Sequence, residues 1–199
     1  MTEPNWRPMQ RRLGMVEDNA PGRVTFAALF AKMGAGPQRS RDLALGAAVH
    51  LPAHGIMDSP LRLAHWTGQG GHESGGFLYM EEVGGLSYFA RYDGRKDLGN
   101  TLPGDGALFH GRGVFQLTGR ANYRAYGEAL GMDLEANPTL AAMPAIGVLI
   151  AARYWRDKGL NALADADNLE AITRKINGGV NGLDDRRART AKAKGLIIP

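Results

Sequence analysis

The sequence predicts a mainly helical domain that contains one long irregular loop. Apolar residues recur at intervals of three and four along most of the 199 residues, which is the spacing of a buried helix face. No segment alternates apolar and polar residues convincingly enough to predict a strand. Residues 81–113 follow neither pattern and are rich in glycine, and so long a loop is uncommon in a compact domain unless it carries function. A short β-hairpin within this loop is compatible with the sequence.

Two helices are predicted near the start of the chain. Thr25 is predicted to cap a short helix that ends at Gly34, and residues 34–40 are predicted to form a linker. A second apolar helix is predicted over residues 42–50. It should end before Pro52, because the residue that precedes a proline disfavours helical backbone angles.

The helix over residues 60–73 has the clearest start signal in the chain. Ser59 followed by Pro60 combines a capping side chain with a proline at the first helical position. Each glycine inside a helix costs about 1 kcal/mol relative to alanine. This helix contains three glycines, Gly68, Gly70 and Gly71. We therefore expect it to pack unusually closely against a neighbour or to fray.

Four further helices are predicted after the loop. Thr118 is predicted to cap the first, which ends at Gly131, and Pro144 is predicted to begin the second. Residues 168–176 and 184–194 should form the last two. The predicted total is about eight helices.

Composition excludes several classes of protein. A formal net charge of +4 suits an anionic polymer as partner, but the charges are scattered. The tight basic groups, Arg11 with Arg12 and residues 186–189, are not interleaved with aromatic residues, which argues against a nucleic-acid-binding protein. We interpret both groups as solvated helix faces. The absence of cysteine excludes a thiol nucleophile, a disulfide and a cysteine-bound zinc.

Glu73 is a candidate general acid. It stands at the end of an apolar helix, where loss of hydration favours a protonated carboxyl. Gly75 and Gly76 follow it, and glycines are natural helix terminators that also allow a ligand to approach the backbone closely. Such an acid is one half of the pair of carboxyl groups that glycoside hydrolysis needs.

Glu81 and Glu82 are both candidates for the second carboxyl. A continuing helix would place Glu82 about 13 Å beyond Glu73, because nine residues rise about 1.5 Å each. That distance exceeds the separation of roughly 6.5–9.5 Å found in inverting glycosidases. A helix break at Gly75 and Gly76 would instead let the chain turn back across a cleft, and the residues alone do not choose between the two glutamates.

Six motifs in order between His72 and Asn181 resemble glycoside hydrolase family 19, the chitinase-type fold that bacteriophage endolysins also use. Their number and order over about 110 residues make the resemblance far more specific than any single motif. The spacing of nine residues between the glutamates and the absence of cysteine favour the endolysin branch over plant-type chitinases. The motifs are HESGGF at 72–77, EE at 81–82 with LSY at 86–88, GRKDLGN at 94–100, GDG at 104–106, GRGVFQLTGRANY at 111–123 and INGGVNG at 176–182.

The resemblance implies roles for three catalytic residues. The acid of the family is the glutamate of the HE pair, which is Glu73 here. The second glutamate of the phage enzymes lies a few residues past the phenylalanine, which selects Glu82 over Glu81. The family also places the attacking water against a hydroxyl that corresponds to Thr118.

Substrate-binding residues are expected in the same segments. Arg112 is counted among them, although its main expected role is to fix the loop by pairing with a carboxylate. Tyr88, Phe115 and Tyr123 have rings that could stack on sugars, but apolar spacing favours core packing for at least two of them; Tyr88 is kept as the binding candidate. Amide side chains offer donors and acceptors to sugar hydroxyls. The amides that the resemblance assigns to sugar binding are Gln116, Asn122 and Asn177.

The resemblance implies a lysozyme-like helical domain whose long loop lines a substrate cleft, with no cofactor and no metal. The implied activity is that of an endolysin-type glycosidase, which hydrolyses β-1,4 bonds of bacterial peptidoglycan with inversion of configuration. Three alternatives remain: a chitinase acting on chitin oligomers, a non-catalytic wall-binding module, and a zinc amidase. The amidase would have to use His50 and His54, which Pro52 separates.

Residues 39–199 are predicted to form the catalytic domain. Residues 1–38 form a separate helical segment with a faint likeness to half of a peptidoglycan-binding module, so they could bind the wall or pack on the catalytic body. The expected partner is the glycan strand of peptidoglycan, with no nucleic acid and no stable membrane insertion, and the expected state is a monomer. No signal peptide is apparent in residues 1–15. We therefore expect synthesis in a host cytoplasm and action on the wall after release, assisted by a holin.

Overall fold

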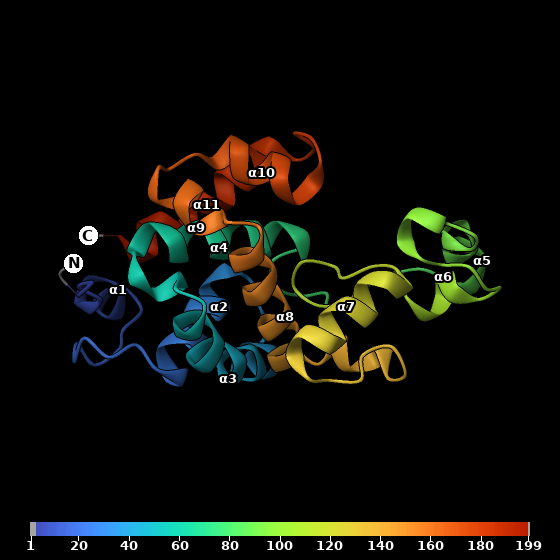
Figure 1. The fold of residues 1–199 in the computed structure, drawn as a ribbon. Helices are drawn as coiled ribbons and strands as arrows, with labels where there is room; N and C mark the ends of the chain where they lie inside the picture. Colours follow the sequence, from blue (N-terminus) through green and yellow to red (C-terminus); the bar gives the residue numbers. More distant parts are fainter. Residues whose placement is uncertain (1–2, 199) are drawn as a thin grey trace.

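Seven helices of nine residues or more form the framework of the computed structural model, which describes residues 3–198. Eight shorter helical segments connect them. Figure 1 shows that α1 and the C-terminal end of α11 meet at the end of the molecule opposite α5 and α6. The long helices are α2 (Arg23–Met33), α3 (Pro37–Ala53), α4 (Pro60–Glu73), α7 (Arg120–Leu130), α8 (Pro144–Asp157), α10 (Leu169–Asn177) and α11 (Leu183–Ile197). The short α-helices are α1 (Arg7–Arg12), α5 (Leu86–Phe89), α6 (Asp105–Leu108) and α9 (Leu160–Asp165). The 3₁₀ turns are η1 (Ile56–Asp58), η2 (Ala90–Tyr92), η3 (Lys96–Leu98) and η4 (Pro138–Ala142).

Proline and capping signals located several helix ends correctly. The Ser59 hydroxyl accepts a hydrogen bond from the backbone N–H of Leu61 at 3.2 Å, so it caps α4 as predicted. Pro144 is the first residue of α8, and Gly131 ends α7 in the left-handed conformation with φ 65°. These signals are local, which is why the sequence reveals them.

Other boundaries were predicted wrongly. Helix α2 begins at Arg23 after an extended Gly22, so Thr25 lies buried inside its first turn and does not cap it. Helix α3 begins at Pro37, which shortens the linker to residues 34–36. It also continues through Pro52, because its last turn is held by burial of the preceding Leu51 rather than by backbone propensity.

Thr118 also does not cap a helix. Helix α7 begins at Arg120 after Gly119, whereas the Thr118 hydroxyl donates to the carbonyl of Gln116 at 2.9 Å. The reason lies in the preceding turn, where Gln116 has a positive φ of 52° and brings its own carbonyl within reach of the threonine. The Thr118 hydroxyl therefore forms its hydrogen bond within the loop and does not cap α7.

Short helical turns order the glycine-rich loop. Residues 81–113 contain α5, η2, η3 and α6. Two isolated antiparallel bridges, from Glu81 to Arg112 and from Arg112 to Leu117, replace the hairpin that the sequence allowed, and no longer strand occurs within residues 3–198. The loop is thus tied at its two ends, where it meets the rest of the chain.

A buried carboxylate organises the base of this loop. Asp105 is fully buried and accepts hydrogen bonds from the backbone N–H groups of Thr101 and Leu102 at 2.9 and 3.0 Å. Its main charged partner is Arg120, whose hydrogen bond holds the pKa of Asp105 below its usual value. Arg120 also pairs with Glu135, so the loop, α7 and the segment before η4 share one ionic network.

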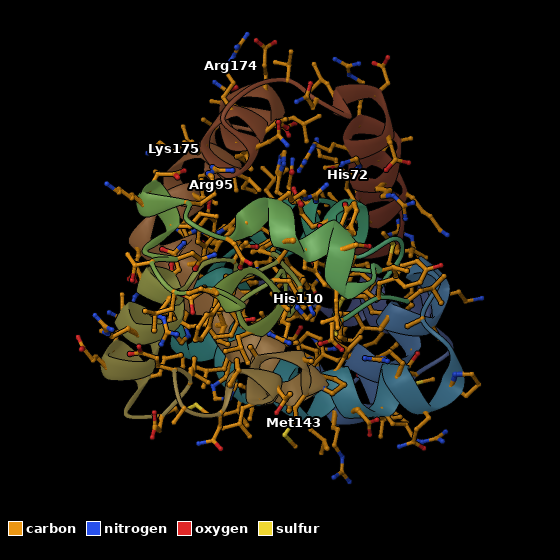
Figure 2. All side chains as sticks on the ribbon, turned by 90° about the vertical axis from the view of Figure 1, so that its right-hand side faces the viewer. His72, Arg95, His110, Met143, Arg174 and Lys175 are labelled. Carbon is orange, nitrogen blue, oxygen red and sulfur yellow. The ribbon has the colours of Figure 1, made fainter. Side chains whose placement is uncertain are left out.

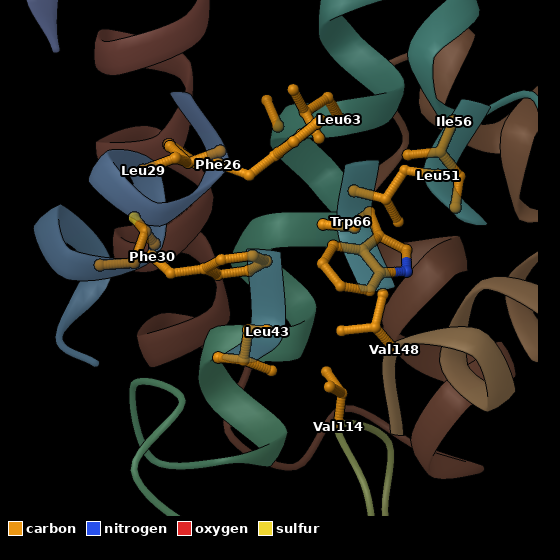
Figure 3. Close-up of a cluster of buried hydrophobic side chains, with 14 of the residues drawn as sticks. Phe26, Leu29, Phe30, Leu43, Leu51, Ile56, Leu63, Trp66, Val114 and Val148 are labelled. Atoms are coloured by element: carbon orange, nitrogen blue, oxygen red, sulfur yellow. The ribbon is translucent and has the colours of Figure 1, made fainter. Parts of the chain in front are cut away.

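The buried apolar side chains form two cores that meet at α8. The larger core joins α1, α2, α3, α4, α8, α9 and α11, and Figure 3 shows Phe30, Trp66 and Val148 from three of these helices within it. The smaller core lies under α7 and consists of Phe109, Tyr123, Leu134, Ala141 and Ile150. Helix α8 contributes to both, with Val148 in the larger core and Ile150 in the smaller.

Close packing explains the glycines of α4. A Cβ atom on Gly68 would lie 2.2 Å from the hydroxyl oxygen of Thr190 and 2.6 Å from its Cα, both on α11. A Cβ on Gly70 would lie 2.9 Å from a methyl group of Val114. Of the two predicted outcomes, close packing and fraying, the structure therefore selects close packing.

The N-terminal segment contributes to the larger core. Trp6, Met9 and Leu13 are buried there together with Phe26. The predicted boundary after residue 38 falls inside α3. The described part of this segment packs on the rest of the chain, and wall binding by it stays a prediction. Among the described residues, no helix has the length and apolar character needed to cross a membrane.

Candidate active site

Glu73 is the last residue of α4, and the chain turns sharply after it. Gly75, Gly76 and Phe77 have consecutive positive φ angles of 59°, 81° and 64°. Positive φ is accessible to glycine without steric cost, whereas Phe77 is held in it by complete burial of its ring. The predicted helix break is confirmed, and it directs the chain toward Glu82.

A buried arginine holds the Glu73 carboxylate. Arg186 of α11 donates one hydrogen bond to Oε1 of Glu73 and another to Oε1 of Gln69, one turn earlier on α4. Its Nε donates to the carbonyl of Asn181 at 3.2 Å. Arg186 is 1% exposed, so its interpretation as part of a solvated helix face was wrong, whereas its neighbour Arg187 is exposed as expected. Its partner lies 113 residues away, which is why helical spacing could not reveal it.

Glu82 is held by side chains of the loop. Its Oε1 accepts hydrogen bonds from Arg91 at 2.7 Å, the Tyr92 hydroxyl at 3.0 Å and the Tyr88 hydroxyl at 3.2 Å. Its Oε2 accepts from the backbone N–H of Gly111 at 3.3 Å. Every group around this carboxylate is a donor, which suits a carboxylate that acts in its ionised form.

Gly111 brings the second glutamate and Thr118 together. The backbone N–H of Glu82 donates to the carbonyl of Gly111 at 2.8 Å, in addition to the bond to Oε2. A Cβ on Gly111 would lie 2.7 Å from the side-chain oxygen of Gln116 and 3.3 Å from the hydroxyl of Thr118. The structure therefore gathers Glu82, Gln116 and Thr118 around Gly111, where any Cβ would have to displace the end of the Gln116 side chain. Sequence reasoning had assigned no role to Gly111, although it opens the GRG motif.

A cavity of about 320 Å³ lies next to this cluster. Its wall includes Gln116, Thr118 and Asn122 from the loop and α7, and Tyr154 and Lys158 from the end of α8. The cavity is therefore bounded on one side by residues that the sequence assigned to catalysis and sugar binding.

Glu73 lies within electrostatic reach of this cavity, although neither glutamate lines it. Burial raises the pKa of Tyr154, and the negative charge of Glu73 raises it further. Figure 2 shows the same face, with His72, the neighbour of Glu73, at the upper right, Lys175 at the upper left and His110 between them and lower. The neighbour of Glu73 and a residue of the Glu82 loop are thus seen from the same side of the molecule.

The predicted sugar-binding amides occupy accessible positions. Asn122 is exposed on the first turn of α7, and its side-chain N–H group donates to the carbonyl of Thr118 at 2.7 Å. Asn177 is the last residue of α10 and is exposed, and the preceding Ile176 lines the cavity. The Gln116 amide donates to the carbonyl of Gly113 at 2.9 Å, so its orientation is fixed.

Two of the three aromatic candidates pack in the cores, as predicted, and one is partly exposed. Tyr123 is fully buried and donates its hydroxyl to the carbonyl of His110 at 2.9 Å. Phe115 packs against the larger core and stacks on Trp155 with ring centroids 6.2 Å apart. Tyr88 is 42% exposed, but its hydroxyl is directed at Glu82, so it contacts a catalytic candidate.

Arg112 fixes the loop through Glu81. It is buried and donates from Nε to Glu81 at 2.7 Å and from Nη1 to the carbonyl of Leu108 at 2.7 Å. Burial raises the pKa of Glu81, but hydrogen bonds and charges from Arg112 and His110 outweigh it, so that pKa lies below its usual value. The expected pairing with a carboxylate is present, and the partner is Glu81 rather than Glu82. Arg112 also lines the cavity, but its Nε and Nη1 groups donate to partners within the protein.

The histidines of the amidase alternative show no arrangement for a metal. Nδ1 of His54 forms a hydrogen bond with the carbonyl of His50 at 2.8 Å. Within residues 3–198, no three His, Asp or Glu side chains are grouped to hold a metal ion.

A helical domain with one glutamate at a helix end and a second beside a hydroxyl has the groups that a glycoside hydrolase requires. The chain belongs to glycoside hydrolase family 19, because the family model described as "Chitinase class I" matches residues 30–186. This confirms the predicted family, the helical fold and the enzyme class. The endolysin branch stays a prediction.

Several proteins resemble this chain over most of its length. A "Glycosyl hydrolase family 19 domain-containing protein" of Haemophilus influenzae is 30% identical over 63% of this chain and 75% of its own. The endochitinase At2g43610 of Arabidopsis thaliana is 30% identical over 77% of this chain, which spans only 54% of the plant protein. The crystal structure of chitinase C from Streptomyces griseus aligns with a TM-score of 0.67 and 26% identity, covering 88% of this chain and 93% of that one.

Proposed function

We propose that this glycoside hydrolase cleaves β-1,4 bonds in the glycan strands of bacterial peptidoglycan, with inversion at the anomeric carbon. Glu73 acts as the general acid and protonates the oxygen of the departing sugar. Glu82 acts as the general base on a water molecule at the opposite face of the sugar ring. The proposal requires one carboxyl to donate a proton while the other accepts one. The two glutamates have different partners, Arg186 for Glu73 and three side chains of the loop for Glu82.

The surroundings of Thr118 support its role in positioning the water. Its hydroxyl hydrogen is donated to the carbonyl of Gln116, so its oxygen lone pairs remain free to accept. Oε2 of Glu82 is a second acceptor, which also contacts Gly111. A water between them can donate one hydrogen to each and direct its own lone pair at the anomeric carbon.

The choice of an anionic glycan rests on two lysines, one that lines the cavity and one that contacts that lysine. Lys158 lines the cavity, and Lys175 places its ammonium group 3.0 Å from the carbonyl of Lys158. Within the described residues, neither lysine forms an ion pair with a carboxylate. Peptidoglycan strands carry peptide stems with carboxylates, whereas chitin is neutral, so unpaired positive charge beside the site favours peptidoglycan.

Digestion of purified sacculi tests this function. We expect soluble fragments whose new reducing-end sugar, identified by mass spectrometry, also shows which bond is cut. Changing both Lys158 and Lys175 to Met should raise KM for sacculi at low salt and leave the hydrolysis of neutral chitin oligomers unchanged. Equal effects on both substrates, or no solubilised fragments from sacculi, would contradict the proposal.

A chitinase is the second candidate, because several relatives are named endochitinases. The two functions share a mechanism and differ in substrate. Turnover of chitin hexamer that far exceeds turnover of peptidoglycan fragments of equal length would favour the chitinase. For either substrate, proton NMR early in the digest should show the inverted anomer first, and a retained anomer would overturn the single-displacement mechanism.

A further inference from the structure

The two oxygens of the Glu82 carboxylate have unequal surroundings. Oε1 accepts three hydrogen bonds, from Arg91, Tyr92 and Tyr88, at 2.7 to 3.2 Å. Oε2 accepts one, from the N–H of Gly111 at 3.3 Å. An ionised carboxylate has about two lone-pair positions on each oxygen. Oε1 can therefore accept no further hydrogen bond, whereas Oε2 can still accept one.

Arg91 is held in place by two aromatic rings. Its guanidinium carbon lies 3.7 Å from the centroid of the Tyr88 ring and 4.7 Å from that of the Tyr92 ring. Its Nη2 also donates to the Tyr92 hydroxyl at 2.7 Å, and that hydroxyl in turn donates to Glu82. A guanidinium stacked in this way keeps its plane and its direction. The three side chains together, Tyr88, Arg91 and Tyr92, are called the Glu82 clamp below.

Stability does not account for the clamp. The Arg91 side chain is 47% exposed, and an exposed ion pair contributes only about 0–1 kcal/mol to folding. Burial raises the pKa of Tyr92, and Glu82 raises it too, although the hydrogen bond from Arg91 opposes them. The phenol therefore stays protonated at neutral pH and remains a donor to the carboxylate.

We propose that Arg91 is a positioning residue that, with Tyr92 and Tyr88, occupies Oε1 of Glu82 and leaves Oε2 as the oxygen that takes the proton from water. This inference rests on the proposed function, in which Glu82 is the base. Oε2 is also the oxygen that accepts from the N–H of Gly111, the residue whose Cβ position lies beside the Thr118 hydroxyl. The clamp thus selects both the orientation of the base and the face from which water attacks.

The protons and electrons of this step balance within the site. An O–H bond of water breaks and its proton moves to Oε2 of Glu82, while the water oxygen bonds to the anomeric carbon. The bond from that carbon to the departing oxygen breaks, and this oxygen takes the proton of Glu73. Glu82 is left protonated and Glu73 ionised, and exchange with solvent restores both.

Arg91→Ala tests the inference, with Arg95→Ala as a matched control. Arg95 is 49% exposed and pairs only with Asp97 at the surface, and Figure 2 shows it on the same face. We expect Arg91→Ala to lower kcat on chitin hexamer or sacculi about 100-fold, because a misplacement of about 1 Å can cost that much. KM should change less than twofold, Arg91→Lys should recover part of kcat, and millimolar guanidinium should partly restore Arg91→Ala alone. Arg95→Ala should behave as the wild type.

Two outcomes would overturn the inference: Arg91→Ala keeping kcat within twofold of the wild type, or losing activity through KM alone. If Arg91→Ala fails to fold by circular dichroism, Tyr92→Phe removes a single hydroxyl and should still lower kcat more than KM. Glu82→Ala separates the two proposals. An active Glu82→Ala would refute the proposed function, whereas an inactive Glu82→Ala with a fully active Arg91→Ala would refute only the clamp.

Discussion

Glu73 lies at the end of a fourteen-residue helix that is packed into the larger core, whereas Glu82 lies in a loop outside both cores. Arg186, which holds Glu73, is 1% exposed and reaches across from another long helix. Arg91, which holds Glu82, is exposed and nine residues away in the same loop. The proposed acid is therefore positioned by the core, and the proposed base by contacts within its own loop. This difference predicts which substitutions affect catalysis alone and which also affect stability.

The largest effect should come from the carboxyl groups themselves. Glu73→Gln keeps the shape of the side chain and removes its acidic proton, so kcat should fall by about 10²–10⁴-fold. The melting temperature should fall as well, because the buried Arg186 loses its charged partner. The substitution should also abolish lysis of cells, whereas a non-catalytic wall-binding module would be unaffected.

Comparison of the adjacent glutamates tests the choice of base. Glu82→Ala should lose nearly all activity, and Glu81→Ala should keep most of it, because Glu81 pairs with Arg112 and His110 away from Thr118. Kinetics on one soluble oligomer measure both variants. Equal losses of activity in the two variants would show that any change in this loop lowers activity, and that Glu82 has no special role.

Arg186→Met should damage both stability and activity. Removing one partner of a buried pair typically costs about 3 kcal/mol or more, and in a chain of this length that lowers the melting temperature by roughly 6–12 °C. Arg91→Ala should lower the melting temperature by at most about 4 °C, given the contribution of about 0–1 kcal/mol from an exposed pair. Calorimetry of the two variants checks the contrast directly. The double variant Glu73→Gln, Arg186→Met should recover part of the lost stability, because no unpaired charge remains.

Gly68→Ala should destabilise the helix that carries Glu73. The added Cβ would lie 2.6 Å from the Thr190 Cα, so α4 and α11 must separate, at a cost of about 1–3 kcal/mol. Gly71→Ala is the matched control, because its Cβ would meet its nearest atom at an ordinary 3.6 Å, and it should stabilise the helix by about 0.5–1 kcal/mol. Denaturant unfolding distinguishes them, and similar values for the two would contradict the close contact.

Acid should weaken the ion pairs around the loop of Glu82. The pKa of Glu135 is lowered to about 2 from an ordinary 4.5, and the hydrogen bond from Arg124 is the largest cause. A lowered folded-state pKa contributes stability that is present above about pH 4.5 and is lost as the pH falls toward 2. Glu135→Gln should therefore be less stable than the wild type at pH 6, and the two should converge near pH 2. A constant difference over this range would show that Glu135 does not act through its charge.

Local signals predicted much of the framework and the helix end at which Glu73, the proposed acid, lies. Ser59 with Pro60 located the start of α4, and Gly75 with Gly76 located its end beside Glu73, because caps, prolines and glycines act on their immediate neighbours. Two of the boundaries that failed, at Thr25 and Pro52, are those where burial of a nearby side chain overrides local preference. The helix start predicted at Thr118 failed because of the backbone turn at Gln116. The fold was therefore predictable where backbone chemistry decides it.

The sequence by itself determined the helical pattern, the glutamate at a helix end and the ordered motifs that indicate a glycosidase. Only the tertiary structure decided that Arg186 is buried against Glu73 and that α11 packs closely against Gly68. It also decided that Gly111 lies between Glu82 and Thr118. Glu73 and Arg186 are 113 residues apart, and Gly68 and Thr190 belong to different helices. Contacts of this kind depend on which helix faces meet, and spacing along one helix carries no information about a partner on another.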